Sequence, residues 1–244
     1  MNLVIDIGNT GIKIAVFNPE DEMTHFERTT SAQIISLLEG LIKTYPLTDV
    51  IISQVGQPVP GLENWFKTQA IKVLYLNTTL KLPFHIKYKS PGTLGADRLA
   101  LVAGAVLKQP QGDKLIIDAG TCVTYDFVDI NKNYHGGAIS PGLQLRFKSL
   151  HDYTANLPLL KPEKSPAPLT GKDTVSSIQA GVIGGLVNEI EGFIVKYNLK
   201  YPDLTVYLTG GDEKVLDRYI KNKIFVSSKF LLLEGLNFIL NLNK

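Results

Sequence analysis

Two segments of the sequence place an aspartate, a glycine and a hydroxyl side chain directly after a short apolar run. The first segment is LVIDIGNTGIKIAVF at residues 3–17, and the second is LIIDAGTCVTYDFV at residues 115–128. In each, a glycine-containing turn follows the aspartate, and a second strand-like run then returns. Glycine lets backbone N–H groups approach phosphate oxygens closely, and a hydroxyl such as that of Thr10 or Thr121 adds a further donor. The pattern is typical of hairpins that hold a phosphate group.

Charged side chains at the same turns suit the other components of a phosphate site. Asp6 and Asp118 end their strands, where a carboxylate can approach a hard cation directly or through its waters. Lys13, on the return strand of the first hairpin, can add a positive charge. A third glycine turn, TGGD at residues 209–212, follows a strand and suits the flat face of a nucleoside. Together the three turns predict a nucleotide as ligand.

Either hairpin taken alone also fits ordinary turn chemistry. An aspartate beside a glycine can bond its own backbone, so a single turn of this kind requires no ligand. Two better-known phosphate motifs do not fit. A dinucleotide fold needs G-x-G-x-x-G leading into a helix, whereas the first glycine turn leads into IKIAVF, which has β character. The P-loop spacing is absent, and TGKDT at residues 170–174 resembles it only in part.

The two hairpins lie about 110 residues apart and occupy corresponding places in two halves of the chain. Such a repeat indicates an internal duplication, in which two halves face each other across a cleft. The short polar segment QPQGDK at residues 109–114 separates the halves. The sequence therefore predicts two domains, residues 1–110 and residues 111–244.

Strand and helix patterns alternate along the chain, which predicts an α/β fold. Helical spacing or helix boundaries occur at residues 31–45, 60–69, 92–109, 174–198 and 229–240. Strands are expected, besides the two hairpins, at residues 49–55, 72–76, 134–139, 204–209 and 223–228. Four prolines predict an irregular loop at residues 151–174. Four glycines in the long helix at 174–198 indicate that another backbone packs very close to it.

Composition excludes several classes of protein. The 244 residues are 44% hydrophobic and 20% charged, which is ordinary for a soluble globular chain, and the net charge of +2 gives no support for a nucleic-acid or membrane partner. The single cysteine, Cys122, allows no internal disulfide, and we expect it to pack rather than to act as a nucleophile. His135 and His151 have no metal-ligand spacing around them. With no leader-like or membrane-spanning apolar run, the expectation is a soluble cytoplasmic protein.

Further motifs extend the pattern over essentially the whole chain. YKSPGTLGADR lies at residues 88–98, and GGAISPGL, TANLP, DTVSSIQAGVIGG and LTGGD follow the second hairpin in that order. With the paired hairpins, these motifs resemble the type III pantothenate kinases, within the superfamily of actin, sugar kinases and heat-shock-chaperone ATPases. The resemblance implies two ribonuclease H-like domains, each a mixed sheet with helices, facing across a nucleotide cleft.

The resemblance also implies an activity and a set of site residues. The activity is ATP-dependent phosphorylation of pantothenate to 4'-phosphopantothenate, the first step of coenzyme A biosynthesis. Residues similar to those that contact ATP are Asp6, Ile7, Gly8, Asn9, Thr10, Gly11, Ile12, Lys13 and Thr121. Residues similar to those that contact pantothenate are Tyr88, Gly95, Ala96, Asp97, Arg98 and Thr174. Asp97 resembles the general base, and Asp118 resembles the ligand of a monovalent cation, potassium or ammonium.

The chemistry of these side chains agrees with the implied roles. Arg98 can hold the carboxylate of pantothenate as a fork, and Asp97 can accept the proton of the attacking hydroxyl. Mg²⁺ would bridge phosphate oxygens of ATP, with Asp6 within reach of the ion or its waters. Without the resemblance, Asp97 and Arg98 would be an exposed pair in the first turn of a helix, where the dipole favours an acid. The role of Arg146 stays open.

Two alternatives to a pantothenate kinase remain. One is a kinase for another small acid or sugar, and the other is a non-enzymatic nucleotide-binding regulatory protein on the same fold. The presence of Asp6, Asp97 and Asp118 as carboxylates speaks against a binding-only protein. The family acts as a homodimer with its pantothenate site near the interface, so the resemblance implies a homodimer here, in which the helix at 174–198 packs across the interface.

Overall fold

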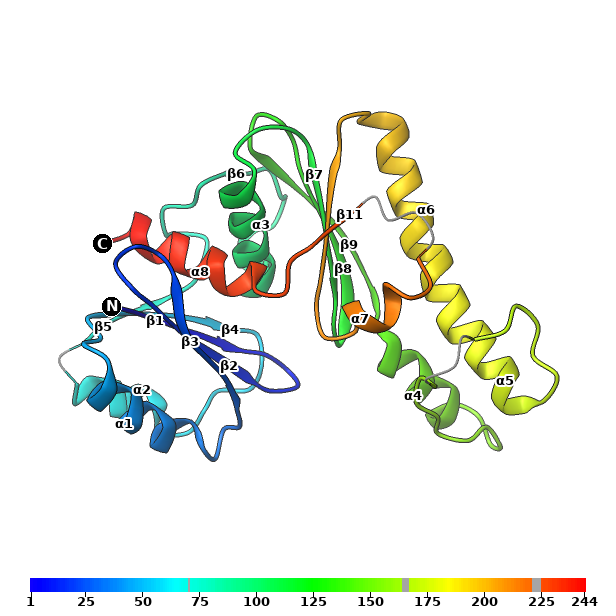
Figure 1. The fold of residues 1–244 in the computed structure, drawn as a ribbon, viewed down its shortest axis with the longest axis horizontal. Helices are drawn as coiled ribbons and strands as arrows, with labels where there is room; N and C mark the ends of the chain where they lie inside the picture. Colours follow the sequence, from blue (N-terminus) through cyan, green and yellow to red (C-terminus); the bar gives the residue numbers. More distant parts are fainter. Residues whose placement is uncertain (70, 164–166, 221–224) are drawn as a thin grey trace. The chain divides into compact units, whose positions relative to one another are not determined.

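The computed structural model describes residues 1–69, 71–163, 167–220 and 225–244 (Figure 1). The chain divides into two compact units. Unit 1 comprises Met1–Pro110, Lys132–Tyr134 and Phe230–Lys244, and unit 2 comprises Gln111–Asn131 and His135–Lys229. Each contains a mixed sheet with helices, which confirms the predicted two-domain α/β class.

The sheet of unit 1 has the strand order β3-β2-β1-β4-β5. Its strands are β1 Asn2–Ile7, β2 Ile12–Phe17, β3 Met23–Thr29, β4 Asp49–Gln54 and β5 Lys72–Tyr75. β1 runs antiparallel to β2 and parallel to β4, so it lies in the middle of the sheet and is buried along its whole length. This explains why its sequence is almost continuously apolar and why Asp6, near its end, stands out.

Helices cover the sheet of unit 1 (Figure 1). The helices are α1 Ile34–Thr44, α2 Leu62–Lys67, α3 Ala96–Lys108 and α8 Leu231–Leu242. Apolar side chains of α1 and α2 pack with alternate residues of β1, β2 and β4 in one core cluster. α3 and α8 pack against each other and against the central strands. Smaller elements are the strand β6 His85–Ile86 and the 3₁₀ turn Pro91–Thr93.

The last helix belongs to unit 1, which corrects its expected place in the second domain. Two glycines allow the close contact with α3. A Cβ on Gly235 would lie 1.9 Å from the carbonyl oxygen of Ala100, and one on Gly104 would lie 2.2 Å from that of Leu231. Only hydrogen atoms fit at these two positions, so α3 and α8 approach backbone to backbone.

The second sheet has the order β11-β10-β7-β8-β9-β6. Its further strands are β7 Lys114–Ala119, β8 Cys122–Val128, β9 Asn133–Pro141, β10 Thr205–Thr209 and β11 Phe225–Ser227. β7 pairs antiparallel with β8 and parallel with β10, which repeats the arrangement of β1 with β2 and β4. β6 pairs only with Asn133 and Tyr134, the end of β9 that belongs to unit 1. The repeated hairpin topology is what the two similar sequence segments predict.

Helices of unit 2 pack on the second sheet around one core cluster. They are α4 Leu143–Asp152, α5 Thr174–Gln179, a π-helical turn Ala180–Gly184, α6 Gly185–Lys200 and the short α7 Glu213–Leu216. Among the described residues, only the continuous stretch from Thr174 to Lys200 is long and apolar enough to cross a membrane by length and composition, but 44% of its most apolar window is buried inside the protein. A core helix of a globular unit has the same properties.

Several expected features differ from the structure. The strand β3 and the helices α4 and α7 were not predicted, and the helix expected from residue 92 begins only at Ala96 because Gly95 is extended. The long helix contains Gly181, Gly184, Gly185 and Gly192, and an added Cβ on each would meet nothing within 4 Å. The expected close backbone is therefore wrong for the described part of this chain. Of the strand expected at 223–228, residues 223–224 lie outside the described residues.

Candidate active site

The first hairpin presents a four-residue turn between β1 and β2. Ile7 pairs with Ile12, and the Gly8 N–H donates to the Gly11 carbonyl over 3.1 Å, which closes the turn. Asn9, Thr10 and Gly11 are exposed at its tip. The turn therefore offers backbone and side-chain donors to solvent, as a phosphate-binding loop requires.

Asp6 is held at the base of this hairpin by two hydrogen bonds. Its side chain is buried, with a residue exposure of 2%, yet Lys13 Nζ lies 3.0 Å from Oδ2 and Ser53 Oγ donates to Oδ1 over 3.2 Å. The strand register explains the contacts, because Asp6 pairs directly with Lys13 on β2 and with Ser53 on β4. The Lys13 side chain remains 38% exposed, so its ammonium group is oriented by Asp6 and still accessible to an anion.

A pocket of about 250 Å³ lies beside the same hairpin. Its lining includes Thr10, Gly11 and Lys13 from the hairpin together with Arg28 from β3. Arg28 pairs directly with Lys13 across β2 and β3, so two cations line one hollow. Sequence reasoning missed Arg28 because it missed β3, a partly exposed edge strand without clear alternation.

The end of β4 connects the first hairpin to the start of α3. The N–H groups of Val55 and Gly56 both donate to the Ile7 carbonyl, over 3.1 and 2.9 Å. A Cβ on Gly56 would lie 2.4 Å from the Gly8 carbonyl oxygen, so the hairpin requires glycine here. The Val55 side chain lies 3.8 Å from the position of a Cβ on Gly95. Val55 thus lies between the first hairpin, to which its N–H donates, and the LGADR segment, whereas Gly56 packs against the hairpin.

The LGADR segment forms the N-terminal turn of α3. The Asp97 carboxylate accepts from the Arg98 backbone N–H over 2.8 Å and lies directly over Gly95, where a Cβ would come within 2.4 Å of Oδ1. Arg98 is only 5% exposed, and its guanidinium carbon lies 5.9 Å from the centre of the Tyr88 ring. The structure therefore brings Tyr88, Gly95, Ala96, Asp97 and Arg98 together in unit 1.

The second hairpin and the third glycine turn lie against each other in unit 2. The Gly120 N–H donates to the Cys122 carbonyl, and the Asp212 N–H donates to the Ala119 carbonyl, both over 3.0 Å. Gly210 has a φ of +105°, and a Cβ there would lie 2.2 Å from the Ala119 oxygen. Asp118, half-buried, pairs with Thr209 at the ends of β7 and β10.

Two side chains at these turns differ in their surroundings. Cys122, expected to pack rather than to act as a nucleophile, lies exposed at the start of β8 and is therefore not part of the core. Burial raises the pKa of the Asp212 carboxyl above its ordinary value. Asp212 therefore carries its charge at a cost, which is common for groups that serve a binding site.

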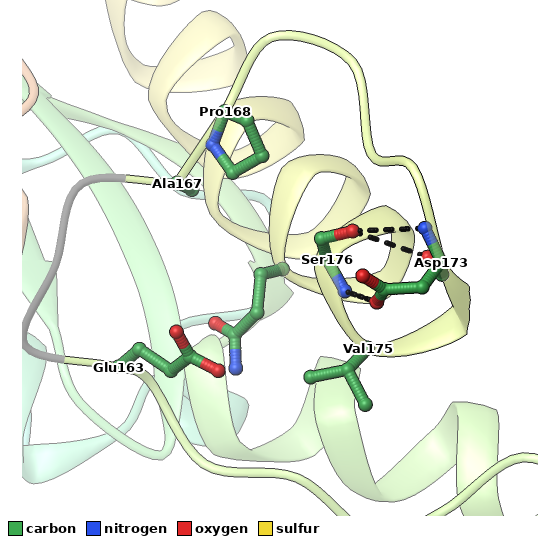
Figure 2. A pocket seen from close by; sticks show the side chains of 7 residues that line it. Glu163, Ala167, Pro168, Asp173, Val175 and Ser176 are labelled. Carbon is green, nitrogen blue, oxygen red and sulfur yellow. Dashed lines mark hydrogen bonds between the residues drawn. The ribbon is translucent and has the colours of Figure 1, made fainter.

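Thr174 belongs to unit 2, whereas the other residues expected to contact pantothenate belong to unit 1. It is exposed at the start of α5, between Asp173 and Ser176, which form a capping box. A pocket of about 450 Å³ lies beside this helix and is lined by Glu163, Ala167, Pro168, Asp173, Val175, Ser176 and Gln179 (Figure 2). None of the residues that the resemblance links to ATP or pantothenate lines it, so we assign it no role.

The carboxylate ligands at these turns suit a cation that binds together with a nucleotide. No cluster of three or more His, Cys, Asp or Glu side chains in the described part of the chain could hold a metal ion. Both oxygens of Asp6 are already hydrogen-bonded, so it can reach a hydrated ion but offers no cage. Mg²⁺ commonly binds through one or two carboxylates and substrate phosphates, and these residues fit that chemistry.

Comparison with known proteins decides the family. A family model described as type III pantothenate kinase matches residues 2–196. The type III pantothenate kinase of Christiangramia forsetii is 48% identical and covers 100% of this chain and 99% of its own. That of Bacteroides fragilis is 43% identical over 100% and 98%. This chain belongs to the type III pantothenate kinase family.

Solved structures share the fold at low sequence identity. A protein of Campylobacter jejuni described as a Baf family transcriptional activator has a TM-score of 0.63 at 20% identity and covers 98% of this chain and 97% of its own. A 2-dehydro-3-deoxygalactonokinase protein of Sinorhizobium meliloti has a TM-score of 0.59 at 11% identity, over 99% and 97%. These likenesses show that the chain shares its two-unit α/β fold with both proteins.

Proposed function

We propose that the chain transfers the γ-phosphoryl group of ATP to the hydroxyl of pantothenate and forms 4'-phosphopantothenate for coenzyme A biosynthesis. Family membership supports this activity over a regulatory protein or a kinase for another substrate. The observation that supports it most directly is the place of Val55, whose N–H donates to the Ile7 carbonyl at the first hairpin and whose side chain lies 3.8 Å from the position of a Cβ on Gly95. Within unit 1, a phosphate donor and an acceptor held by α3 would therefore lie near each other.

The proposed roles follow from the contacts of each side chain. The turn at residues 8–11 and Lys13 bind the phosphates of ATP, and Thr121 supplies a further phosphate contact. Arg98 binds the carboxylate of pantothenate, and Tyr88 limits the position of the guanidinium group. Asp97 accepts the hydroxyl proton as the oxygen attacks phosphorus. Mg²⁺ bound with ATP would neutralise charge on the phosphates, close to Asp6.

Substitution of the base tests the mechanism. Asp97→Asn keeps the size and the hydrogen bond to the Arg98 N–H but removes the proton acceptor. We expect kcat to fall by roughly 10²- to 10⁴-fold while ATP still binds. Glu63→Gln is the matched control, since Glu63 also lies in the first turn of a unit 1 helix. If Asp97→Asn retained wild-type turnover, Asp97 would not be the base.

The proposed cation site and the assembly rest on unit 2. We propose that Asp118 contributes a carboxylate to a potassium or ammonium ion, because it lies half-buried near the end of β7, beside two glycine turns.

We also propose a cytoplasmic homodimer. Along α6, positions 185, 188, 192, 195 and 199 recur at steps of three and four on an open face. Gly185 and Gly192 leave space there, and Val195 and Leu199 are 50% and 81% exposed.

A further inference from the structure

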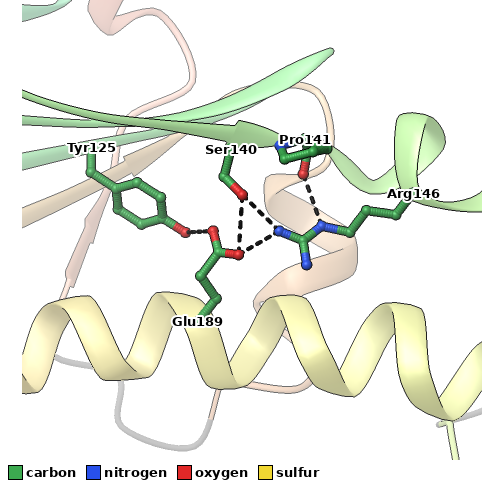
Figure 3. Close-up of polar contacts among 5 residues, drawn as sticks. All are labelled: Tyr125, Ser140, Pro141, Arg146 and Glu189. Atoms are coloured by element: carbon green, nitrogen blue, oxygen red, sulfur yellow. Dashed lines mark hydrogen bonds and ion pairs between the residues drawn. The ribbon is translucent and has the colours of Figure 1, made fainter. Parts of the chain in front are cut away.

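A compact polar network in unit 2 lies beside the second hairpin (Figure 3). Its centre is Glu189 on α6. Tyr125 on β8 donates to Glu189 Oε1 over 2.8 Å, and Ser140 on β9 donates to Oε2 over 3.1 Å. Arg146, in the first turns of α4, forms an ion pair with the same Oε2. Three elements are thus joined to one carboxylate.

The surroundings keep this carboxylate charged and its partners fixed. Burial opposes the charge on Glu189, but the hydrogen bonds from Arg146, Tyr125 and Ser140 outweigh it, so its pKa is lowered from the usual range. The Tyr125 ring is fully buried and stacks on Phe193 at 4.0 Å between ring centres. The network therefore has little freedom to rearrange.

Arg146 extends from Glu189 to the end of β9. Its Nη2 donates to Ser140 Oγ and its Nε donates to the Pro141 carbonyl, both over 2.9 Å. The planar guanidinium group thereby fixes the two residues that precede Gly142. A lysine would offer a point charge but could not hold the same three acceptors in one plane.

Gly142 lies in direct contact with the second hairpin. Its N–H donates to the Thr121 carbonyl over 3.0 Å. A Cβ on Gly142 would lie 2.1 Å from the Gly120 carbonyl oxygen and 2.5 Å from that of Thr121. The backbone at residue 142 thus lies directly against the turn, and a shift of the segment 140–142 would displace the Thr121 peptide.

We propose that Arg146, held by Glu189, is a positioning residue that fixes the Gly120–Thr121 turn through the segment Ser140–Gly142. The proposal rests on the proposed function, in which Thr121 contacts a phosphate of ATP. In this role Arg146 acts on the phosphate contact only through the segment Ser140–Gly142. Its loss would displace the phosphate contact and leave the pantothenate residues of unit 1 unchanged.

The experiment compares steady-state kinetics of Arg146→Gln, Arg146→Lys, Glu189→Gln and Thr121→Val in the full-length protein. Arg146→Gln should lower kcat/KM for ATP by roughly tenfold to hundredfold, since small misplacements at a reacting centre have effects of this size. The KM for pantothenate should stay within about twofold of the wild-type value. Glu189→Gln should have the same kinetics as Arg146→Gln, and Arg146→Lys should recover little of the lost kcat/KM for ATP. Lys148→Gln is the matched control, because Lys148 forms an exposed ion pair with Asp152 on the same helix.

A double variant separates positioning from general structural support. If Arg146 acts through Thr121, Arg146→Gln added to Thr121→Val should have little further effect on kcat/KM for ATP. Fully additive losses, a rise in the KM for pantothenate as large as that in the KM for ATP, or wild-type kinetics of Arg146→Gln would overturn the proposal. Thr121→Val with unchanged ATP kinetics would overturn the phosphate contact and the proposal with it, while pantothenate-dependent turnover would still support the activity. If Arg146→Gln does not fold, the same kinetic comparison is made with Arg146→Lys, which keeps the charge.

Discussion

The buried carboxylate of Asp6 determines what the first hairpin can present to a ligand. A buried charge is costly unless it is paired and hydrogen-bonded, and Lys13 and Ser53 supply both partners. The cost is thereby offset, and the Lys13 ammonium group is held beside a turn of exposed donors. The pairing of Asp6 with Lys13 thus decides which charged group the hairpin can offer to a ligand.

For the Asp212 carboxyl the cost of burial dominates, and the resulting pH dependence of the unfolding free energy can be tested. Burial raises its pKa, so the folded protein binds this proton more tightly than the unfolded chain does. The unfolding free energy therefore falls as pH rises through the raised pKa, and the charged form destabilises the fold at neutral pH. Asp212→Asn should be more stable than the wild type at pH 7.

Chemical denaturation at several pH values measures this effect. The stability difference between Asp212→Asn and the wild type should shrink as the pH falls through the raised pKa, and it should vanish below about 4, where the carboxyl becomes neutral in the unfolded state as well. A variant that is less stable than the wild type at pH 7 would show that Asp212 is stabilised by contacts that outweigh its burial.

Local sequence patterns predicted those elements whose features are local. The glycine turns gave both hairpins, and apolar spacing gave α1, α6 and α8. β3 and α4 were missed because β3 fully buries only Thr29 and α4 fully buries only Leu143 and Phe147. With so few buried apolar residues, the sequence of β3 or α4 cannot be distinguished from that of a polar loop.

Contacts between elements could not be predicted in the same way. Gly56 and Gly142 each lie against a hairpin turn that is distant in sequence, and the sequence around them contains no motif that names the partner. The close approach of α3 and α8 likewise depends on glycines more than 100 residues apart. These long-range contacts decide how the candidate site is supported, whereas its chemistry was predicted from the motifs.

The contact between α3 and α8 makes a prediction at the scale of elements. Gly235→Ala places a methyl group where the Ala100 carbonyl lies, so α8 must shift, and we expect a loss of about 1–3 kcal/mol in unfolding free energy. Gly40→Ala in α1 is the control. A Cβ there meets nothing within 4 Å, and alanine should stabilise that helix by up to about 1 kcal/mol. Equal stability of both variants, measured by denaturation, would contradict the close packing.

The whole molecule repeats one hairpin topology in two units, and the last helix returns to the first unit. The repeat was predictable because each half carries its own glycine turn. The place of α8 was not, since only packing decides it. An assembly of two chains would give the open glycine face of α6 a partner that the described residues of the single chain do not provide.

The proposed homodimer predicts the effect of a charge on this face. Leu199→Glu should shift the protein toward a monomer, because a carboxylate would be buried without a partner in the interface. Light scattering after size-exclusion chromatography measures the mass. Ile130→Glu is the control, since Ile130 is similarly exposed elsewhere in unit 2. A Leu199→Glu variant with the mass of the wild-type dimer would exclude this face as the interface, and a monomeric wild type would contradict the dimer.

The central claim is the transfer of a phosphoryl group from ATP to pantothenate. The most direct measurement is the release of ADP by the purified protein with ATP, Mg²⁺ and pantothenate, first in potassium and then in sodium buffer. We predict turnover that requires pantothenate and falls when sodium replaces potassium. Release of no ADP in either buffer, by protein that still binds ATP, would contradict the proposed activity.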